Sequence, residues 1–305
     1  KKRNINLTHG EWFSFPDWMI ERWVDQFDEE DTLTLCDYFN SPPYIDVRLN
    51  TSQFELELIL NMIEKLGVNW EKSPESNKFI RVKSGVGKLL KSELFKVGMI
   101  NFQDRASGAV VELLDPQKGE TILDVCAAPG TKTNYIFERM NGDGHLFASD
   151  ISSRRLLKGR TRATDLKLPI KWLQKDASVD EFPMADRILI DAPCTGTGVI
   201  ARRPDIRWRR KVSDFDNMNI IQTNILNNMS KYLKPKGTIV YATCSLEKEE
   251  NWDVVSSFLE LNDNFIIKSQ NNLIPEEWIN NNKCLEIFPP NDKVDGMFAV
   301  NIQKI

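Results

Sequence analysis

The sequence predicts an α/β protein in which a doubly wound, mostly parallel sheet follows a small α+β domain. From about residue 119 onward, short runs rich in β-branched and apolar residues alternate with longer amphipathic segments. Alternation of this kind is typical of a parallel sheet with helices on both faces. The beginning of the chain does not show it. We therefore expect a small α+β domain over residues 1–97 and a larger doubly wound domain over residues 98–305.

The small domain is predicted to begin with helices over residues 1–40, because Pro16 marks a helix start and apolar residues recur after it at helical spacing. A strand is expected at 41–51, followed by an amphipathic helix at 53–67 that ends in a glycine. Two further strands are expected, at 77–85 and 96–104.

The larger domain is predicted to contain five strands in alternation with four helices. The strands are expected at 120–127, 145–150, 170–176, 186–193 and 237–244. The helices are expected at 131–140, 152–166, 214–233 and 246–261. Three more strand-like runs, at 265–269, 284–290 and 296–303, are predicted to form an antiparallel C-terminal edge.

The composition of the 305 residues is that of an ordinary globular protein, with 41% hydrophobic and 28% charged residues. No apolar run approaches the ~20 residues of a membrane helix. The five cysteines are widely spaced without a C-x-x-C pair, which argues against a disulfide framework or a zinc site. We expect a cytoplasmic monomer without bound metal. The two histidines give little support to a mechanism with a histidine base.

Three segments are basic although the chain as a whole carries a net charge of −4. Residues 78–96 and 202–211 each hold six Lys or Arg against one acid, and residues 152–175 hold eight against one. Basic stripes on an acidic protein are compatible with a groove for a polyanion. Solvated helix faces are the alternative interpretation of each stripe.

The string LDVCAAPGTKT, at residues 123–133, predicts a cofactor-binding turn between a strand and a helix. Small residues let the backbone approach a ligand, and the start of the helix offers free N–H groups. The dinucleotide pattern G-x-G-x-x-G is absent. Acids end the next three strands at Asp150, Asp176 and Asp191, and an acid after the second strand is placed to hold a ribose. A ribose-bearing cofactor without a pyrophosphate indicates S-adenosylmethionine.

Two cysteines are expected at the same edge of the sheet. Cys194 follows the strand RILIDAP, and Cys244 follows the strand GTIVYAT. A thiolate that adds to carbon 6 of cytosine makes carbon 5 nucleophilic toward a methyl sulfonium, and a carboxyl group such as Asp191 would assist at the ring nitrogen. A second thiol near the ring could assist release of the product. The residues alone leave open which cysteine attacks.

The chain resembles the Sun-type RNA cytosine-carbon-5 methyltransferases, and most closely the RsmB branch, which modifies 16S ribosomal RNA. The strings that carry the resemblance span most of the chain: SFPDWMIERW, SPPYIDVRLN, FQDRAS, LDVCAAPGTKT, IDAPCTGTGVIARRPDIRW, YATCSLEKEEN and DGMFAV. The resemblance implies a Rossmann-type methyltransferase domain that uses S-adenosylmethionine, preceded by a small family-specific RNA-binding domain.

The resemblance also implies roles for particular residues. Cys244 would be the nucleophile, Cys194 the thiol that helps to release the product, and Lys132 and Asp191 would lie near the reacting base. The cofactor pocket would comprise Cys126, Ala127, Ala128, Pro129, Gly130, Thr131, Lys132, Asp150, Arg155, Asp176 and Asp191. The arginines of ARRPDIRW, namely Arg202, Arg203, Arg207 and Arg209, would hold RNA phosphates.

The sequence departs from the pattern of this family at three points. Thr131 stands where a second glycine is common, and we expect it to be tolerated as a helix cap. Gly108 stands where glutamine is frequent. The helical RNA-binding domain of the NusB type that often precedes the RsmB branch is not in the sequence, which does not begin with Met. We expect that this segment was removed.

Three alternatives to a ribosomal RNA substrate remain. Transfer RNA is the nearest, because patterns within this class separate the two substrates poorly. A non-catalytic ribosome-assembly factor is the second, although Cys194, Cys244, Asp191 and Lys132 are all present. DNA cytosine methylation is the third, since Pro193 and Cys194 mimic the Pro-Cys nucleophile of those enzymes.

Overall fold

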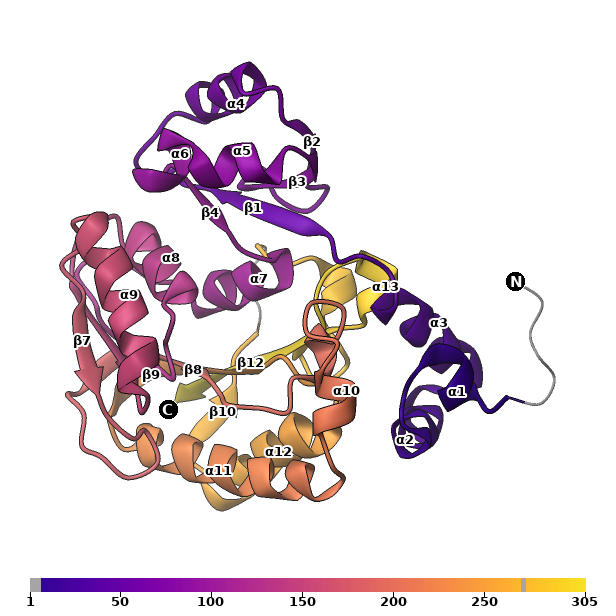
Figure 1. Ribbon diagram of the computed structural model, residues 1–305. Coiled ribbons are helices and arrows are strands. Elements are labelled where there is room, and N and C mark those ends of the chain that lie inside the picture. The colour runs from indigo at the N-terminus through magenta and orange to yellow at the C-terminus, as the bar shows by residue number, and fades with distance from the viewer. Residues whose placement is uncertain (1–6, 270–272) are drawn as a thin grey trace.

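An eight-stranded sheet forms the centre of the larger part of the protein in the computed structural model, which describes residues 7–269 and 273–305 (Figure 1). The strand order is β10-β12-β9-β8-β5-β6-β7, with β11 paired to β12. The strands are β5 (Thr121–Val125), β6 (His145–Asp150), β7 (Lys171–Gln174), β8 (Ala185–Asp191), β9 (Leu233–Thr243), β10 (Phe265–Ile267), β11 (Leu285–Ile287) and β12 (Met297–Lys304). Strands β5 to β9 pair in parallel, whereas β10, β11 and β12 form an antiparallel edge, which confirms the predicted fold class.

Helices cover both faces of this sheet, so its strands are buried on both sides. Ile122 packs with α7 and α8 in one core, while its neighbour Leu123 packs with α11 and α12 in the other. The helices and short 3-10 turns of this part are α7 (Arg105–Leu114), α8 (Thr131–Arg139), α9 (Ser153–Asp165), η1 (Thr197–Val199), α10 (Ile206–Arg209), α11 (Ser213–Ser230), η2 (Lys248–Glu250), α12 (Trp252–Leu261), η3 (Glu276–Trp278) and α13 (Pro289–Asp292).

A separate antiparallel sheet of order β2-β3-β1-β4 forms the small domain, seen at the top of Figure 1. Its elements are β1 (Ile45–Leu49), α4 (Leu56–Lys65), β2 (Asn69–Lys72), β3 (Phe79–Ser84), α5 (Val86–Lys91), α6 (Glu93–Lys96) and β4 (Ile100–Phe102). Strand β4 pairs with β1 although it lies beyond the predicted boundary at residue 97. The small sheet therefore extends to Phe102.

The first three helices do not pack within the small sheet's core. They are α1 (His9–Phe13), α2 (Asp17–Phe27) and α3 (Glu29–Phe39). Trp23 and Phe39 share a core with Ile200, Ile206 and Leu246, which all belong to the larger part of the chain. The predicted domain of residues 1–97 thus contains two packing units, one of which rests on loops of the larger sheet.

Helix α7 joins the small domain to the larger sheet, and the sequence did not predict it. Its Gly108 lies against β3, where an added Cβ would come within 2.3 Å of Cζ of Phe79. The glycine at this departure from the family pattern therefore permits close contact between the two parts. None of the helices in the described part of the chain is long and apolar enough to cross a membrane.

Candidate active site

Two cysteines meet at the carboxyl edge of the larger sheet. Cys194 lies three residues after β8, and Cys244 directly follows β9. These strands are parallel neighbours, with Asp191 beside Ala242, so their ends and the loops that follow emerge together. The two Sγ atoms are 3.3 Å apart and both side chains are half-buried. The geometry brings together the two thiols that the sequence singled out.

The surroundings distinguish the two thiols electrostatically. The hydrogen bond with Cys194 lowers the pKa of Cys244, burial and the carboxylate of Asp191 raise it, and the nearby ammonium of Lys132 lowers it, so that the net direction is downward. The same hydrogen bond raises the pKa of Cys194, and burial and the carboxylate of Glu250 add to that increase. Cys244 is therefore the thiol that ionises more readily, and the thiolate is the nucleophilic form.

Lys132 reaches this edge from the first turn of α8. Its Nζ lies 2.8 Å from Oδ2 of Asp191, the last residue of β8. Burial lowers the pKa of Lys132, but the charge of Asp191 and its hydrogen bond outweigh burial and raise it. The ion pair of Lys132 and Asp191 thus lies beside the two thiols.

Glu250 connects the loops of the two cysteines, although no sequence motif singled it out. This buried carboxylate accepts hydrogen bonds from the backbone N–H of Thr195 at 2.8 Å, from Oγ of Ser245 at 2.6 Å and from Nε2 of Gln222 at 2.9 Å. Burial raises the pKa of Glu250, and these bonds lower it. The string YATCSLEKEEN contains three glutamates, of which Glu247 and Glu250 are both fully buried, and nothing in its pattern shows which of them contacts the loops of the cysteines.

The turn between β5 and α8 has the form expected of a ligand-binding loop. Cys126 has a φ of 62°, in the left-handed region, and Gly130 has a φ of 102°. A Cβ at Gly130 would come within 2.6 Å of the Trp172 ring, so this position requires glycine. Gly130 itself is the N-cap of α8, and no side chain caps that helix. Thr131 is therefore its first residue, whereas the sequence predicted it as a cap.

Asp150, at the end of β6, holds this turn in place. Its carboxylate accepts the N–H groups of Ala128 at 3.2 Å and Ser152 at 2.9 Å. Arg155 pairs with Asp150 at 3.5 Å and also donates to the carbonyl of Ala128. The remaining acid, Asp176, caps its own turn by accepting from the N–H of Ser178 at 2.9 Å.

The residues present at this edge fit a ligand that carries hydroxyl and amino groups. Asp124 on β5 and Ser149 on β6 each have a buried side-chain oxygen without a hydrogen-bond partner in the part of the chain that the structure describes. The carboxylates of Asp150 and Asp191 end neighbouring strands of the same sheet. Donors of a ribose and an amino group would satisfy these acceptors.

The four arginines predicted to hold RNA phosphates are placed differently from one another. Arg203 and Arg209 are exposed. Arg207 is buried and donates to Oδ1 of Asn40 at 2.8 Å, so its guanidinium serves the packing of the N-terminal helices. Its contact with an RNA phosphate stays a prediction, although the structure shows this guanidinium held by protein partners.

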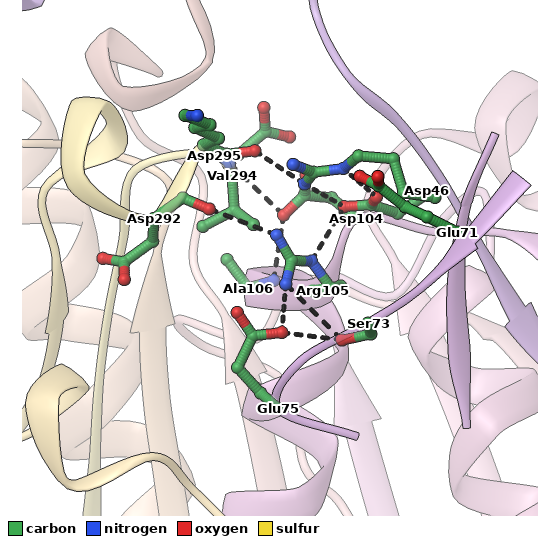
Figure 2. A network of polar contacts seen from close by, with 12 residues as sticks. Asp46, Glu71, Ser73, Glu75, Asp104, Arg105, Ala106, Asp292, Val294 and Asp295 are labelled. Atoms are coloured by element: carbon green, nitrogen blue, oxygen red, sulfur yellow. Dashed lines mark hydrogen bonds and ion pairs between the residues drawn. The ribbon is translucent and has the colours of Figure 1, made fainter. Parts of the chain in front are cut away.

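Arg202 is also occupied by protein partners. It donates to Asp104 at 2.8 Å and to Asp295 at 2.7 Å. Figure 2 shows the surrounding network, in which Arg105 reaches Asp46 of the small sheet at 3.2 Å and the carbonyl of Asp292 at 3.1 Å. These contacts fasten the small domain to the loop that precedes β12.

The sheet order, the small-residue turn and the carboxylates at the carboxyl edge define a methyltransferase of the S-adenosylmethionine-dependent class. The crystal structure of PH0851 superposes on the whole chain with a TM-score of 0.90 and 27% identity, and 70% of that chain is covered. The crystal structure of NSun6 from Pyrococcus horikoshii with SFG has the same fold, with a TM-score of 0.85 at 21% identity over 95% of this chain and 98% of that chain.

Within this class the chain belongs to the 16S rRNA methyltransferase RsmB/F family, whose pattern matches residues 111–303. Residues 15–87 match the ferredoxin-like domain of RsmF/B-like methyltransferases. The chain is 30% identical over 98% of its length to the probable ribosomal RNA small subunit methyltransferase B of Synechocystis sp., and 35% identical over 86% to ribosomal RNA small subunit methyltransferase B of Proteus mirabilis. It spans 68% and 63% of the lengths of these two relatives.

Proposed function

We propose that this chain transfers a methyl group from S-adenosylmethionine to carbon 5 of a cytosine in RNA, and that the RNA is 16S ribosomal RNA. The observation that carries the proposal is the pair of thiols 3.3 Å apart, with the ion pair of Lys132 and Asp191 beside them. Few reactions other than addition to a pyrimidine ring use two thiols next to a methyl donor. The names of the relatives support ribosomal RNA as the substrate.

The cofactor would lie along the loops after β5, β6, β7 and β8. The turn from Cys126 to Lys132 would contact it, and Asp150 and Asp176 would face its ribose and base. Asp150 and Arg155 would act by holding the turn in shape, as their contacts with Ala128 support. When bound, S-adenosylmethionine supplies an electrophilic methyl group on a sulfonium.

The protein's own groups would then handle the cytosine ring. The Cys244 thiolate forms a bond to carbon 6, and the electron pair of the ring double bond makes carbon 5 nucleophilic. The Lys132 ammonium, held by Asp191, stabilises the negative charge that builds up on the ring. After carbon 5 has gained its methyl group, a base removes its proton. The bond from sulfur to carbon 6 breaks, and the double bond forms again.

Cys194 would assist this last step. Its raised pKa keeps it as a thiol, and its hydrogen bond to Cys244 stabilises the departing thiolate. The target base must leave its stack to reach the thiol, so an unpaired stretch of RNA is the expected substrate.

Methyl transfer from labelled S-adenosylmethionine tests the proposal, with protein-free 16S ribosomal RNA and transfer RNA compared under the same conditions. The expected result is label at carbon 5 of cytosine in 16S ribosomal RNA and little in transfer RNA. Preferential labelling of transfer RNA would identify the alternative substrate. If S-adenosylmethionine binds in equilibrium dialysis but neither RNA is labelled, the assembly-factor alternative replaces the catalytic proposal.

The monomeric state and cytoplasmic location stay predictions.

A further inference from the structure

An open groove of about 410 Å³ lies beside the loop that follows η1. One wall comes from Pro42 and Pro43, which follow α3, and the other comes from Trp208 in α10. Trp208 is 63% exposed, which is unusual for so large an aromatic side chain. The groove therefore offers a flat aromatic surface to solvent, and two prolines are also among its lining residues.

A fixed cation borders this groove. Arg207 is one of the lining residues, and its guanidinium stacks on the Phe15 ring at 3.9 Å from the ring centroid. It is held by Oδ1 of Asn40 at 2.8 Å and by the carbonyl of Ser14 at 3.2 Å. Its buried Nε has no hydrogen-bond partner within residues 7–269 and 273–305. Arg207 therefore holds the N-terminal helices against the groove, while Trp208 supplies the exposed aromatic surface.

The loop that carries Trp208 is strongly cationic. Arg203, Arg209 and Lys211 are all exposed. The acid within the loop, Asp205, pairs with Arg209 at 3.2 Å, so the loop retains an excess of positive charge. This charge complements a phosphate backbone.

The same loop is fastened to the catalytic edge. Arg210, two residues after Trp208, donates from Nε to the carbonyl of Thr195 at 2.8 Å and from Nη2 to the carbonyl of Cys194 at 3.4 Å. A strand of RNA whose target base enters beside Cys194 would therefore pass the cationic loop and the groove.

We propose that the groove holds an unpaired nucleobase of the RNA strand outside the target nucleotide, stacked on Trp208, with its phosphates near Arg203 and Lys211. The proposal rests on the proposed function for its choice of RNA. Every base has a π-face, so the contact is tolerant of sequence and adds affinity and position rather than base selection. Because the prolines belong to the N-terminal part, the base would be gripped between two parts of the chain.

Binding of two synthetic RNA probes tests this proposal without any methyl transfer. The probes are a single-stranded oligoadenylate of about 12 nucleotides and an abasic ribose-phosphate oligomer of the same length and charge. Wild-type protein is compared with Trp208→Ala, with Trp208→Phe, which keeps an aromatic face, and with Leu261→Ala. Leu261 is 80% exposed at the end of α12 and controls for the loss of a surface apolar side chain.

The wild type and Leu261→Ala should bind oligoadenylate more tightly than the abasic oligomer. Trp208→Ala should weaken oligoadenylate binding roughly 5- to 150-fold, the range measured for one stacked base, and leave abasic binding unchanged. Trp208→Phe should restore part of the loss. The salt dependence of binding should have the same slope in all four proteins, since Trp208 neutralises no phosphate.

Equal loss of affinity for both probes, or no loss for either, would overturn the stacking proposal. If Trp208→Ala instead lowers the melting temperature well beyond Leu261→Ala while both probes bind normally, the groove holds a protein segment rather than RNA. A wild type that binds oligoadenylate in this Trp208-dependent way but methylates no RNA would refute the proposed function and leave the groove assignment standing. In an active enzyme, Trp208→Ala should raise KM for RNA and leave kcat within about threefold.

Discussion

Two clusters of ionisable groups in this protein each contain an ion pair, but they differ in how far they are exposed to solvent. The cluster at the sheet edge contains Cys194, Cys244, Lys132 and Asp191, and the side chain of Asp191 is still 32% exposed. The cluster at the domain junction contains Arg48 and Glu138, whose side chains are 0% and 7% exposed. Exposure decides the difference. Charged groups at the edge are accessible to a substrate, whereas those at the junction are buried among protein partners.

The partners of Arg48 show how completely the junction is closed. This arginine donates from Nε to Oε1 of Gln103 at 2.7 Å, pairs with Glu138 and stacks on the Tyr135 ring at 4.0 Å. Burial lowers its pKa to about 10, yet it remains charged at neutral pH. Substitutions at the edge should therefore lower the rate of methyl transfer with little change in the free energy of unfolding. Substitutions at the junction should lower the free energy of unfolding with little direct effect on the chemistry.

The largest expected effect follows from removal of the thiol of Cys244. Cys244→Ala should reduce methyl transfer by about 10⁴-fold or more, because no covalent bond to the ring can form. Its urea unfolding midpoint should match that of the wild type. Cys284→Ala, which removes a buried thiol that is not among the candidate catalytic residues, is the control and should retain activity. Substantial methyl transfer by Cys244→Ala would show that Cys244 is not the nucleophile.

The next largest effect is expected at the junction. Arg48→Met leaves the Glu138 carboxylate buried without its cation, which should cost about 3–5 kcal/mol in the free energy of unfolding. Urea denaturation measures this loss. The double variant Arg48→Met with Glu138→Met should be more stable than Arg48→Met alone. If the double variant loses as much free energy of unfolding as the two single variants added together, Arg48 and Glu138 do not stabilise the protein as a pair.

Removal of the Lys132 charge should change reactivity in a pH-dependent way. The ammonium lowers the pKa of Cys244, so Lys132→Met should move the midpoint of Cys244 alkylation by iodoacetamide to higher pH. Methyl transfer should fall by about 10²- to 10³-fold. Lys231→Met serves as a surface control. An unchanged alkylation profile would show that Lys132 does not act on the thiol.

A smaller effect is expected at Asp124, a buried carboxyl group of the edge that is not among the catalytic candidates. Burial raises the pKa of Asp124 to about 7, and the hydrogen bond from Thr133 opposes that shift. A raised folded pKa means that stability is complete below the unfolded value near 4 and declines as pH rises to 7, by up to about 4 kcal/mol. Asp124→Asn should flatten this slope in urea denaturation between pH 4 and 7. If stability declines as steeply with pH in Asp124→Asn as in the wild type, the decline comes from other ionisable groups.

The sequence predicted the edge cluster because its two cysteines and Asp191 lie at or just after strand ends, and because the family resemblance added Lys132, which lies in the first turn of α8. Cys194 and Cys244 follow β8 and β9, and parallel strands end at the same edge, so their meeting follows from the fold class. The five parallel strands and the antiparallel C-terminal edge were predictable from alternation alone. Helix α7 could not be predicted in this way. Its buried face includes Gly108, and only the folded structure shows that this glycine packs against Phe79 of the small domain.

The junction could not be predicted, because its partners are far apart in the chain. Arg48 and Glu138 are separated by 90 residues, and Arg202 and Asp295 by 93. The same limit applies to the partners of Arg207. Its place in a basic string predicted a phosphate contact, whereas the fold directs it to Ser14 and Asn40 of the N-terminal helices.

The most direct measurement is the amount of covalent complex between protein and RNA on denaturing gels, with S-adenosylmethionine and 16S ribosomal RNA. Wild type, Cys244→Ala and Cys194→Ala are compared. If Cys244 attacks and Cys194 assists release, as proposed, Cys194→Ala should accumulate the complex and Cys244→Ala should form none. A complex in Cys244→Ala together with its loss in Cys194→Ala would reverse the roles of the two thiols and contradict the account.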